Sequence, residues 1–369
     1  MYDTMFMLRT EINASLGMGN EMKNRNITAI IYALAAALFY AINIPCSKLL
    51  LEKIDPTFMA SFLYLGAGIG VGTMYLFHYK SEKPEERLSR KDLPYTLGMI
   101  VLDIIAPILL MIGISIGTSS NATLLGNFEI VATTVIALLL FKEKVSKKLW
   151  LAIIFITSSS IILSFGGSGS LQFSLGSLFV VGATVCWGLE NNCTRSISEK
   201  STYQIVTIKG FFSGTGSLIV AFVIGEKYPD VRYMMLAFLL GFVAYGLSIF
   251  TYIRAQKTLG AAKTSAYYSF APFLGAFLTF MLLHEALTVS YAIAFLLMLL
   301  GTVFVVADTL ANRHVHNHMH TITHTHNGST HTHTITHSHE HTHYISEDNH
   351  GHKHSVTELE NLFVNHDVK

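Results

Sequence analysis

The stretch F-E-I-V-A-T-T-V-I-A-L-L-L-F-K-E-K-V-S occupies residues 128–146, and a related stretch occurs later in the chain. Residues 270–288 read F-A-P-F-L-G-A-F-L-T-F-M-L-L-H-E-A-L-T. Each stretch opens on Phe and continues through a mostly apolar run, and a glutamate, Glu143 or Glu285, follows near its end. Such a run is long enough for most of a membrane-spanning helix, which needs about 20 residues. The repetition predicts a membrane protein built from two related halves.

The amino-acid composition argues against a soluble protein. Of the 369 residues, 51% are hydrophobic and 13% are charged, whereas a soluble domain carries about 25% charged residues. The formal net charge is +1, so no strong charge indicates a nucleic-acid partner. The three cysteines predict neither a disulfide framework nor a cysteine-based zinc site.

The apolar segments number ten, and the loops between them are short. Because each half holds five segments, an odd number, the halves must cross the membrane in opposite senses. We predict an all-α integral membrane protein of about ten transmembrane helices, arranged as two inverted five-helix repeats. The segments are 27–44, 58–78, 95–116, 121–141, 149–163, 175–192, 204–224, 234–252, 264–283 and 291–307.

Changes of composition mark the predicted boundaries. The first residues are polar, a Gly/Ser-rich stretch separates the halves, and histidine dominates after Asp308. These changes predict an N-terminal extension at 1–25, a first repeat at 26–165, a linker at 166–173, a second repeat at 174–308 and a tail at 309–369.

The basic residues predict the orientation. Twenty Lys and Arg fall on the side of the membrane that holds the N-terminus, four fall in the opposite loops, and Lys209 lies inside a span. Because cytoplasmic loops carry the excess of basic residues, we predict that both termini are cytoplasmic.

Several short motifs match one known family. They are Asp55-Pro56 after Lys48, Asp92-Leu93-Pro94, Glu143-Lys144-Val145-Ser146, Glu285-Ala286-Leu287-Thr288, and Arg254-Ala255 with Ala261-Ala262. Through them, residues 27–308 resemble the EamA-like branch of the drug/metabolite transporter superfamily. The resemblance implies two inverted repeats around a central cavity, and commonly the export of small organic solutes. Family members typically carry Glu-Pro early in the fourth and ninth spans, whereas this chain has Glu129-Ile130 and Ala271-Pro272.

We therefore expect a secondary transporter that moves a small metabolite, amino acid or drug-like solute. It would act across the plasma membrane by alternating access, in the direction of export, with proton coupling as an option. No Gly-x-x-x-x-Gly-Lys-Ser/Thr motif occurs, which argues against ATP-driven transport, and we expect neither an enzyme activity nor a required cofactor. The expected partners are the solute and the lipid bilayer. The alternative is a transition-metal cation transporter, or a metal-sensing membrane protein that uses the tail.

Four ionisable residues fall inside the predicted spans, where a charge costs about 2.5–3.5 kcal/mol on insertion scales. Glu190 and Lys209 lie near one end of a helical hairpin, so they form either a structural ion pair or a cavity-lining pair for a charged solute. Glu129 either couples transport to protons, since a carboxyl group away from water can hold a proton, or bonds to a neighbouring helix. The fourth is Asp103.

Other polar and aromatic residues extend the candidate site. At about 100° per residue, Asn121 and Thr133 share a helix face with Glu129. Aromatic side chains can form stacking walls for a solute, or they can be interface and core residues. Glu143 and Glu285, at span ends, are expected to cap or pair at helix junctions. The remaining candidates for the substrate or coupling site are Asn43, Asn191, Trp187, Tyr245 and Tyr267.

Fifteen of the chain's eighteen histidines fall between His314 and His354 in the tail, mostly as His-x-His. Its polarity predicts a disordered segment. Imidazole is a favoured ligand for zinc, nickel, copper and cobalt, so the tail is a candidate metal-binding segment. The alternatives are a low-complexity tail without a role and a pH-responsive segment. The candidate ligands are His318, His320, His324, His326, His331, His333, His337 and His339.

Overall fold

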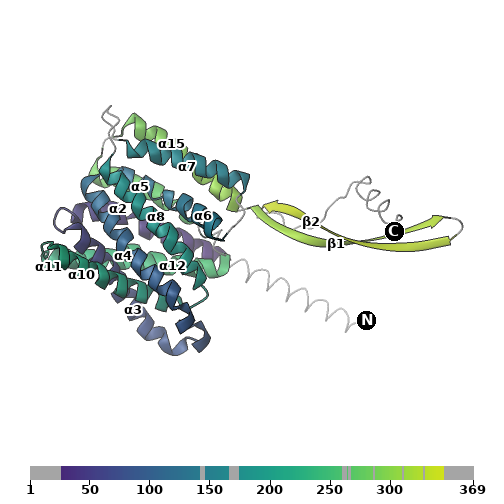
Figure 1. Ribbon diagram of the computed structural model, residues 1–369, viewed down its shortest axis with the longest axis horizontal. Coiled ribbons are helices and arrows are strands. Elements are labelled where there is room, and N and C mark those ends of the chain that lie inside the picture. Colours follow the sequence, from purple (N-terminus) through teal and green to yellow (C-terminus); the bar gives the residue numbers. More distant parts are fainter. Residues whose placement is uncertain are drawn as a thin grey trace, which may run out of the picture. The chain divides into compact units, whose positions relative to one another are not determined.

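The computed structural model describes residues 26–141, 146–165, 174–259, 264, 267–285, 287–309, 311–326 and 329–344 (Figure 1). The predicted N-terminal extension and the predicted linker lie outside these residues. The chain forms two compact units, Met1–Val306 and Ala307–Lys369.

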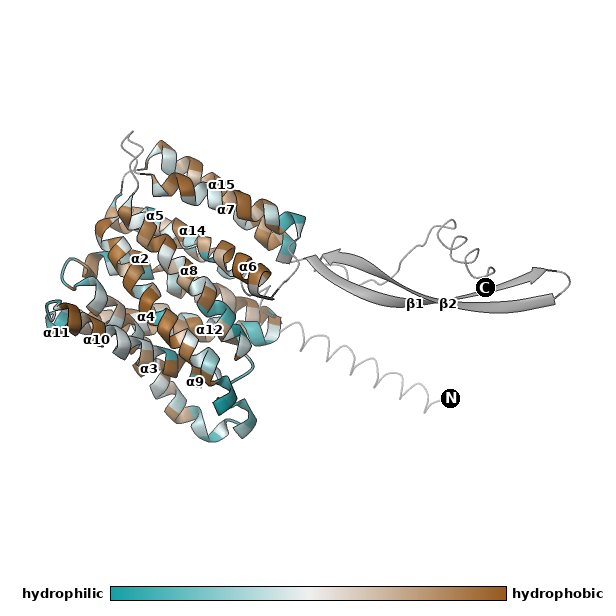
Figure 2. Cartoon of the chain, in the orientation of Figure 1, coloured by the Kyte–Doolittle hydropathy of each residue, from teal (hydrophilic) through white to brown (hydrophobic). Residues whose placement is uncertain are grey.

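The first unit is a bundle of helices in its described residues. Many side chains on the outside of the bundle are large and apolar, which fits a surface in contact with lipid (Figure 2). The helices, the last of which extends past the unit, are α2 (Asn43–Leu50), α3 (Pro56–His78), α4 (Leu93–Ile116), α5 (Ser119–Leu125), α6 (Phe128–Phe141), α7 (Lys147–Ser164), α8 (Leu175–Ser196), α9 (Thr202–Ile208), α10 (Gly214–Ile224), α11 (Val231–Gly241), α12 (Ser248–Leu259), α14 (Ala271–Leu283) and α15 (Val289–Thr309).

Seven helical stretches in the described residues are long and apolar enough to cross a membrane. The three other predicted spans are also helical: α8, the broken pair α5–α6, and the short helix α14. The structure therefore confirms an all-α bundle of membrane-spanning type, and the count of ten spans stays a prediction. The seven stretches are Asn26–Leu50, Pro56–Ser81, Pro84–Ile116, Lys147–Ser164, Thr202–Ile224, Val231–Leu259 and Val289–Asp308.

The two related stretches that closed on Glu143 and Glu285 begin at matching breaks. A turn at Gly126–Asn127 precedes α6, and a turn at Ser269–Phe270 precedes α14. Pro272 stands in the first turn of α14, where a missing backbone N–H costs nothing. Interrupted helices at corresponding positions of two repeats mark binding sites in many transporters.

Helices from the two halves pack closely through glycines. A Cβ atom on Gly210 would lie 2.3 Å from the backbone nitrogen of Gly68, and one on Gly241 would lie 2.1 Å from the carbonyl oxygen of Leu63. Only glycine allows backbones to approach this closely. α3, from the first half, is thereby packed against α9, α10 and α11 of the second half.

The last helices of the two halves also meet. α7 and α15 lie side by side (Figure 1), and the Ser159 hydroxyl donates to the carbonyl oxygen of Ala294 at 2.7 Å. Ile156 and Met298 are fully buried in the apolar contact between them. The halves are thus in contact at α7 and α15 as well as at α3.

The second unit contains two antiparallel strands, β1 (Ala311–His326) and β2 (Ser329–Tyr344). The expectation of a tail without regular structure differs from the structure over these residues. His alternates there with Thr, Ile and Val, and this period of two with β-branched residues suits a strand. The register places His318 opposite His337 and His324 opposite His331.

Candidate functional site

A buried ion cluster lies inside the bundle. The Lys209 ammonium Nζ is 3.0 Å from Oδ2 of Asp103 and 3.0 Å from Oε1 of Glu190. The Asp103 side chain is 0% exposed, that of Glu190 is 2% exposed and that of Lys209 is 9% exposed. Three of the four predicted ionisable residues therefore meet at one point, and Asp103 joins the pair that the sequence suggested.

Three elements hold the cluster. Asp103 lies within α4, Glu190 lies in the last third of α8, and α4 packs along α8. Lys209 begins η4 (Lys209–Ser213), a π-helical turn between α9 and α10. The extra residue of a π-helical turn shifts the side chains that follow, and such turns occur often at functional sites.

Two hydroxyl groups complete the surroundings of the carboxylates. Tyr64, on α3, donates to Oδ1 of Asp103 at 2.9 Å, and Thr194, on α8, donates to Oε1 of Glu190. The cluster sets two carboxylates against one ammonium group, so full ionisation leaves one uncompensated negative charge. Because such a charge is costly in the interior, the cluster favours binding of a proton or of a cationic group.

A second polar contact lies one residue further along α8. The Asn191 amide donates to Oε1 of Glu129 at 2.6 Å and to the Thr133 hydroxyl at 3.4 Å. Two adjacent residues of α8 therefore make the two contacts: Glu190 pairs with Lys209, and Asn191 donates to Glu129. Glu129 is half-buried and lies in the first turn of α6.

The prediction that Asn121 shares a face with Glu129 is wrong. The Asn121 amide donates to the carbonyl oxygen of Leu163 at 3.2 Å. The turn at Gly126–Asn127 separates α5 from α6, so one continuous angle of 100° per residue does not hold across it.

Tyrosine rings form a chain beside the carboxylates. Tyr245 stands 5.1 Å from Tyr64 and 6.0 Å from Tyr40, measured between ring centroids. Tyr40 is 5.9 Å from Tyr268, which is 5.1 Å from Tyr252. This row of tyrosine rings thus extends from the Asp103 side of the bundle towards α12.

The aromatic and amide residues predicted for the site lie at different positions relative to this row of tyrosine rings. Asn43, fully buried, donates to the Tyr245 hydroxyl at 3.2 Å, so both predicted residues lie beside the cluster. Trp187 is 8% exposed and packs in the main core. Tyr267 is half-buried, but its neighbour Tyr268 supplies the ring contacts.

Sequence reasoning missed Tyr64, Tyr40 and Thr194. The available signal for Tyr64 was a hydroxyl group in the middle of an apolar, glycine-rich span. Thr194 stands one helical turn after Glu190, a spacing at which side chains on a helix can meet.

Glu285 caps a helix. Its carboxylate accepts from the backbone N–H groups of Ser119 at 2.9 Å and Ser120 at 3.0 Å, at the start of α5. An acidic group satisfies the unpaired N–H groups of a helix N-terminus. Glu143 lies outside the described residues.

The described part of the chain contains no group of three or more His, Cys, Asp and Glu that could hold a metal ion. For the tail histidines, the structure gives only the backbone register of β1 and β2.

Comparison with known proteins decides the family. A model of the EamA-like transporter family matches residues 27–165 and again residues 174–307. The chain belongs to the EamA-like transporter family. As an EamA-like transporter it is a multi-pass membrane protein, and each matched region corresponds to one repeat.

Two relatives support this EamA-like assignment. An "Uncharacterized transporter" of Methanothermobacter thermautotrophicus is 25% identical over 298 residues, which is 75% of this chain and 85% of that protein. "Uncharacterized transporter YyaM" of Bacillus subtilis is 23% identical over 272 residues, 70% of this chain and 87% of that protein. A solved structure titled "Crystal structure of protein" is similar in fold, with a TM-score of 0.57 and 15% identity, covering 76% of this chain and 96% of that one.

The two matched regions divide the ion cluster between them. Asp103 and Tyr64 belong to the first EamA-like repeat, whereas Glu190 and Lys209 belong to the second. Glu129 and Asn191 are divided in the same way. Both polar contacts therefore cross the interface between the repeats.

Proposed function

We propose that this EamA-like protein is a secondary transporter that exports a small metabolite, amino acid or drug-like solute by alternating access. The observation that carries the proposal is the buried cluster of Asp103, Glu190 and Lys209, which joins the two repeats. Sites for substrate and coupling ion commonly lie where the repeats of a transporter meet.

The proposal includes ten spans in two inverted repeats, with both termini in the cytoplasm and the protein in the plasma membrane. Inverted repeats supply two equivalent packings that open one site to either side in turn. The matching breaks before α6 and α14 support this arrangement, because each lies at the same place in its repeat. The energy source is a solute or proton gradient.

Purified protein in liposomes tests the proposal. Vesicles preloaded with unlabelled amino acids or drug-like amines are diluted into the labelled compound, without ATP. We expect exchange of at least one compound above the rate of protein-free vesicles. A complete absence of exchange across both panels, with folded protein in the membrane, would contradict the proposed function.

Glu129→Gln is expected to remove the pH dependence of transport. Its carboxylate has an amide partner, Asn191, at 2.6 Å and lies between the repeats, so a proton bound there could be exchanged between the two sides. A glutamine keeps the shape and cannot bind a proton. Transport driven by a pH gradient should fall to the rate measured without a gradient.

The exposed Glu52→Gln is the matched control, and its pH profile should equal that of the unmodified protein. Unaltered pH dependence in Glu129→Gln would remove Glu129 from the coupling mechanism.

A metal-binding role for the tail is a second candidate. The register of the hairpin supports it, because His316 is paired with His339 and His318 with His337. The Cβ atoms of residues directly opposite each other in an antiparallel pair lie about 4.5–5.5 Å apart. We expect calorimetric titration of the full chain with Zn²⁺ or Ni²⁺ to show binding that is lost on truncation after Asp308. Solute exchange should persist in the truncated chain; unchanged metal binding there would contradict the role.

A further inference from the structure

Two glutamates occupy matching positions at opposite ends of α3. Glu226 follows α10, and its carboxylate accepts from the backbone N–H groups of Thr57 at 3.0 Å and Phe58 at 2.8 Å, at the start of α3. Glu82 follows α3, and its carboxylate accepts from the hydroxyl of Ser201, directly before α9. Glu226 lies 144 residues after Glu82, and Ser201 lies 144 residues after Thr57. The contacts are therefore counterparts in the two repeats.

The Glu226 contact is reciprocal. The backbone N–H of Lys227 donates to Oδ2 of Asp55 at 2.9 Å. Each chain segment thus gives a carboxylate to the other, and the start of α3 is fastened to the end of α10. We call this set of bonds the Glu226 latch.

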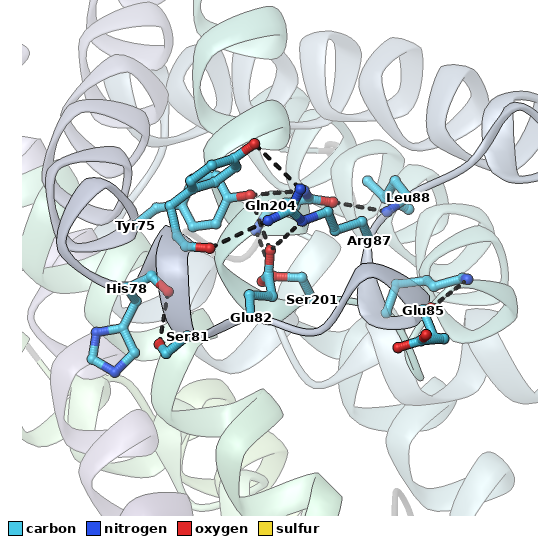
Figure 3. Close-up of polar contacts among 11 residues, drawn as sticks. Tyr75, His78, Ser81, Glu82, Glu85, Arg87, Leu88, Ser201 and Gln204 are labelled. Atoms are coloured by element: carbon cyan, nitrogen blue, oxygen red, sulfur yellow. Dashed lines mark hydrogen bonds and ion pairs between the residues drawn. The ribbon is translucent and has the colours of Figure 1, made fainter.

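The Glu82 contact is built from side chains (Figure 3). Oε2 of Glu82 accepts from the Tyr75 hydroxyl at 3.0 Å and lies 3.6 Å from Nε of Arg87. Gln204, on α9, donates to the Tyr75 hydroxyl at 2.8 Å and accepts from the backbone N–H of Leu88 at 2.8 Å. We call this set of bonds the Glu82 latch, and it fastens the end of α3 to the start of α9.

Between the latches the same helices pack against each other at several positions, and their closest backbone approach is near the middle. Gly68 of α3 meets Gly210 of η4, where a Cβ on Gly210 would lie 2.3 Å from the Gly68 nitrogen. The contact lies near the middle of α3 and of the stretch from α9 to α10. A close contact without side chains can act as a pivot, because a tilt there displaces little bulk.

We propose that the Glu82 and Glu226 latches open alternately as the two helices tilt about the Gly68–Gly210 contact. This inference rests on the proposed alternating-access transport. A tilt separates the helices at one end and brings them together at the other, and hydrogen bonds between latch groups weaken steeply with distance. Each latch therefore favours closure of its own side of the membrane.

Hydrogen exchange of the full chain in lipid nanodiscs, without any solute, tests the latches. Glu82→Gln should raise exchange about tenfold at the start of α9, the size expected for one charge-assisted hydrogen bond. It should also increase protection of the Thr57 and Phe58 amides at the other end. Glu226→Gln should give the mirror image and serves equally if Glu82→Gln fails to fold.

The exposed Glu199→Gln, near the start of α9, is the matched control and should change neither end. Exchange that rises only at the substituted end would make each glutamate a local helix cap and overturn the proposal. If hydrogen exchange changes at both ends but no solute moves in liposomes, the proposed transport is contradicted and the alternating latches are supported. If solute is transported but hydrogen exchange changes only at the substituted end, the alternating latches are contradicted and the proposed transport is supported.

Discussion

Lys209→Met is expected to abolish solute transport and to destabilise the folded protein by about 3–5 kcal/mol. The substitution leaves Asp103 and Glu190 as two buried carboxylates that have lost their shared cation at 3.0 Å. Such groups lack water to solvate them, so removing one partner of a buried ion pair costs far more than the pair contributes. Thermal unfolding in detergent measures the loss of stability, and vesicle exchange measures transport.

A charge-neutral variant separates the two effects. The combination of Asp103→Asn, Glu190→Gln and Lys209→Met removes all three charges with little change of volume, so most of the stability should return. Solute transport should stay absent, because the ionisable groups are gone. A Lys209→Met protein as stable as the unmodified chain would contradict the buried ion cluster.

Gly210→Ala is expected to have the second largest effect. The added methyl group would lie 2.3 Å from the nitrogen and 2.4 Å from the Cα of Gly68, and these backbone atoms cannot move aside as a side chain can. The helices must separate, and overpacking of this kind costs about 1–3 kcal/mol or more. We expect a lower unfolding temperature in detergent and reduced transport.

Gly182→Ala is the matched control on α8. Its Cβ would lie 3.4 Å from a methyl carbon of Leu109, an ordinary contact. Because alanine is a better helix former than glycine by about 1 kcal/mol, this variant should be equally or more stable. Equal stability of the two variants would contradict the close Gly68–Gly210 contact.

The sequence predicted the architecture because its signals are periodic and local. The paired stretches at 128–146 and 270–288 indicated repeated helices, and the structure starts α6 and α14 within them. The breaks before these helices were not predicted, because the spans were assigned from their apolar length, although Gly126–Asn127 is a pair that favours turns. That omission misplaced Asn121.

The candidate site was predicted in part. Glu190 and Lys209 are near each other along the chain, so a hairpin argument could pair them. Asp103 and Tyr64 come from other helices, and only the packing of α3, α4 and α8 brings them to Lys209. Long-range assembly of this kind leaves no spacing in the sequence. The strands of the tail were missed because polarity was weighed above the alternation of His and Thr.

The most direct test of a solute site between the repeats is exchange in liposomes without ATP. It compares the unmodified protein with the charge-neutral variant at Asp103, Glu190 and Lys209, at equal amounts of folded protein. We predict that the unmodified protein exchanges the solute and that the variant does not. Exchange by the variant at the unmodified rate would contradict a role for this cluster in transport.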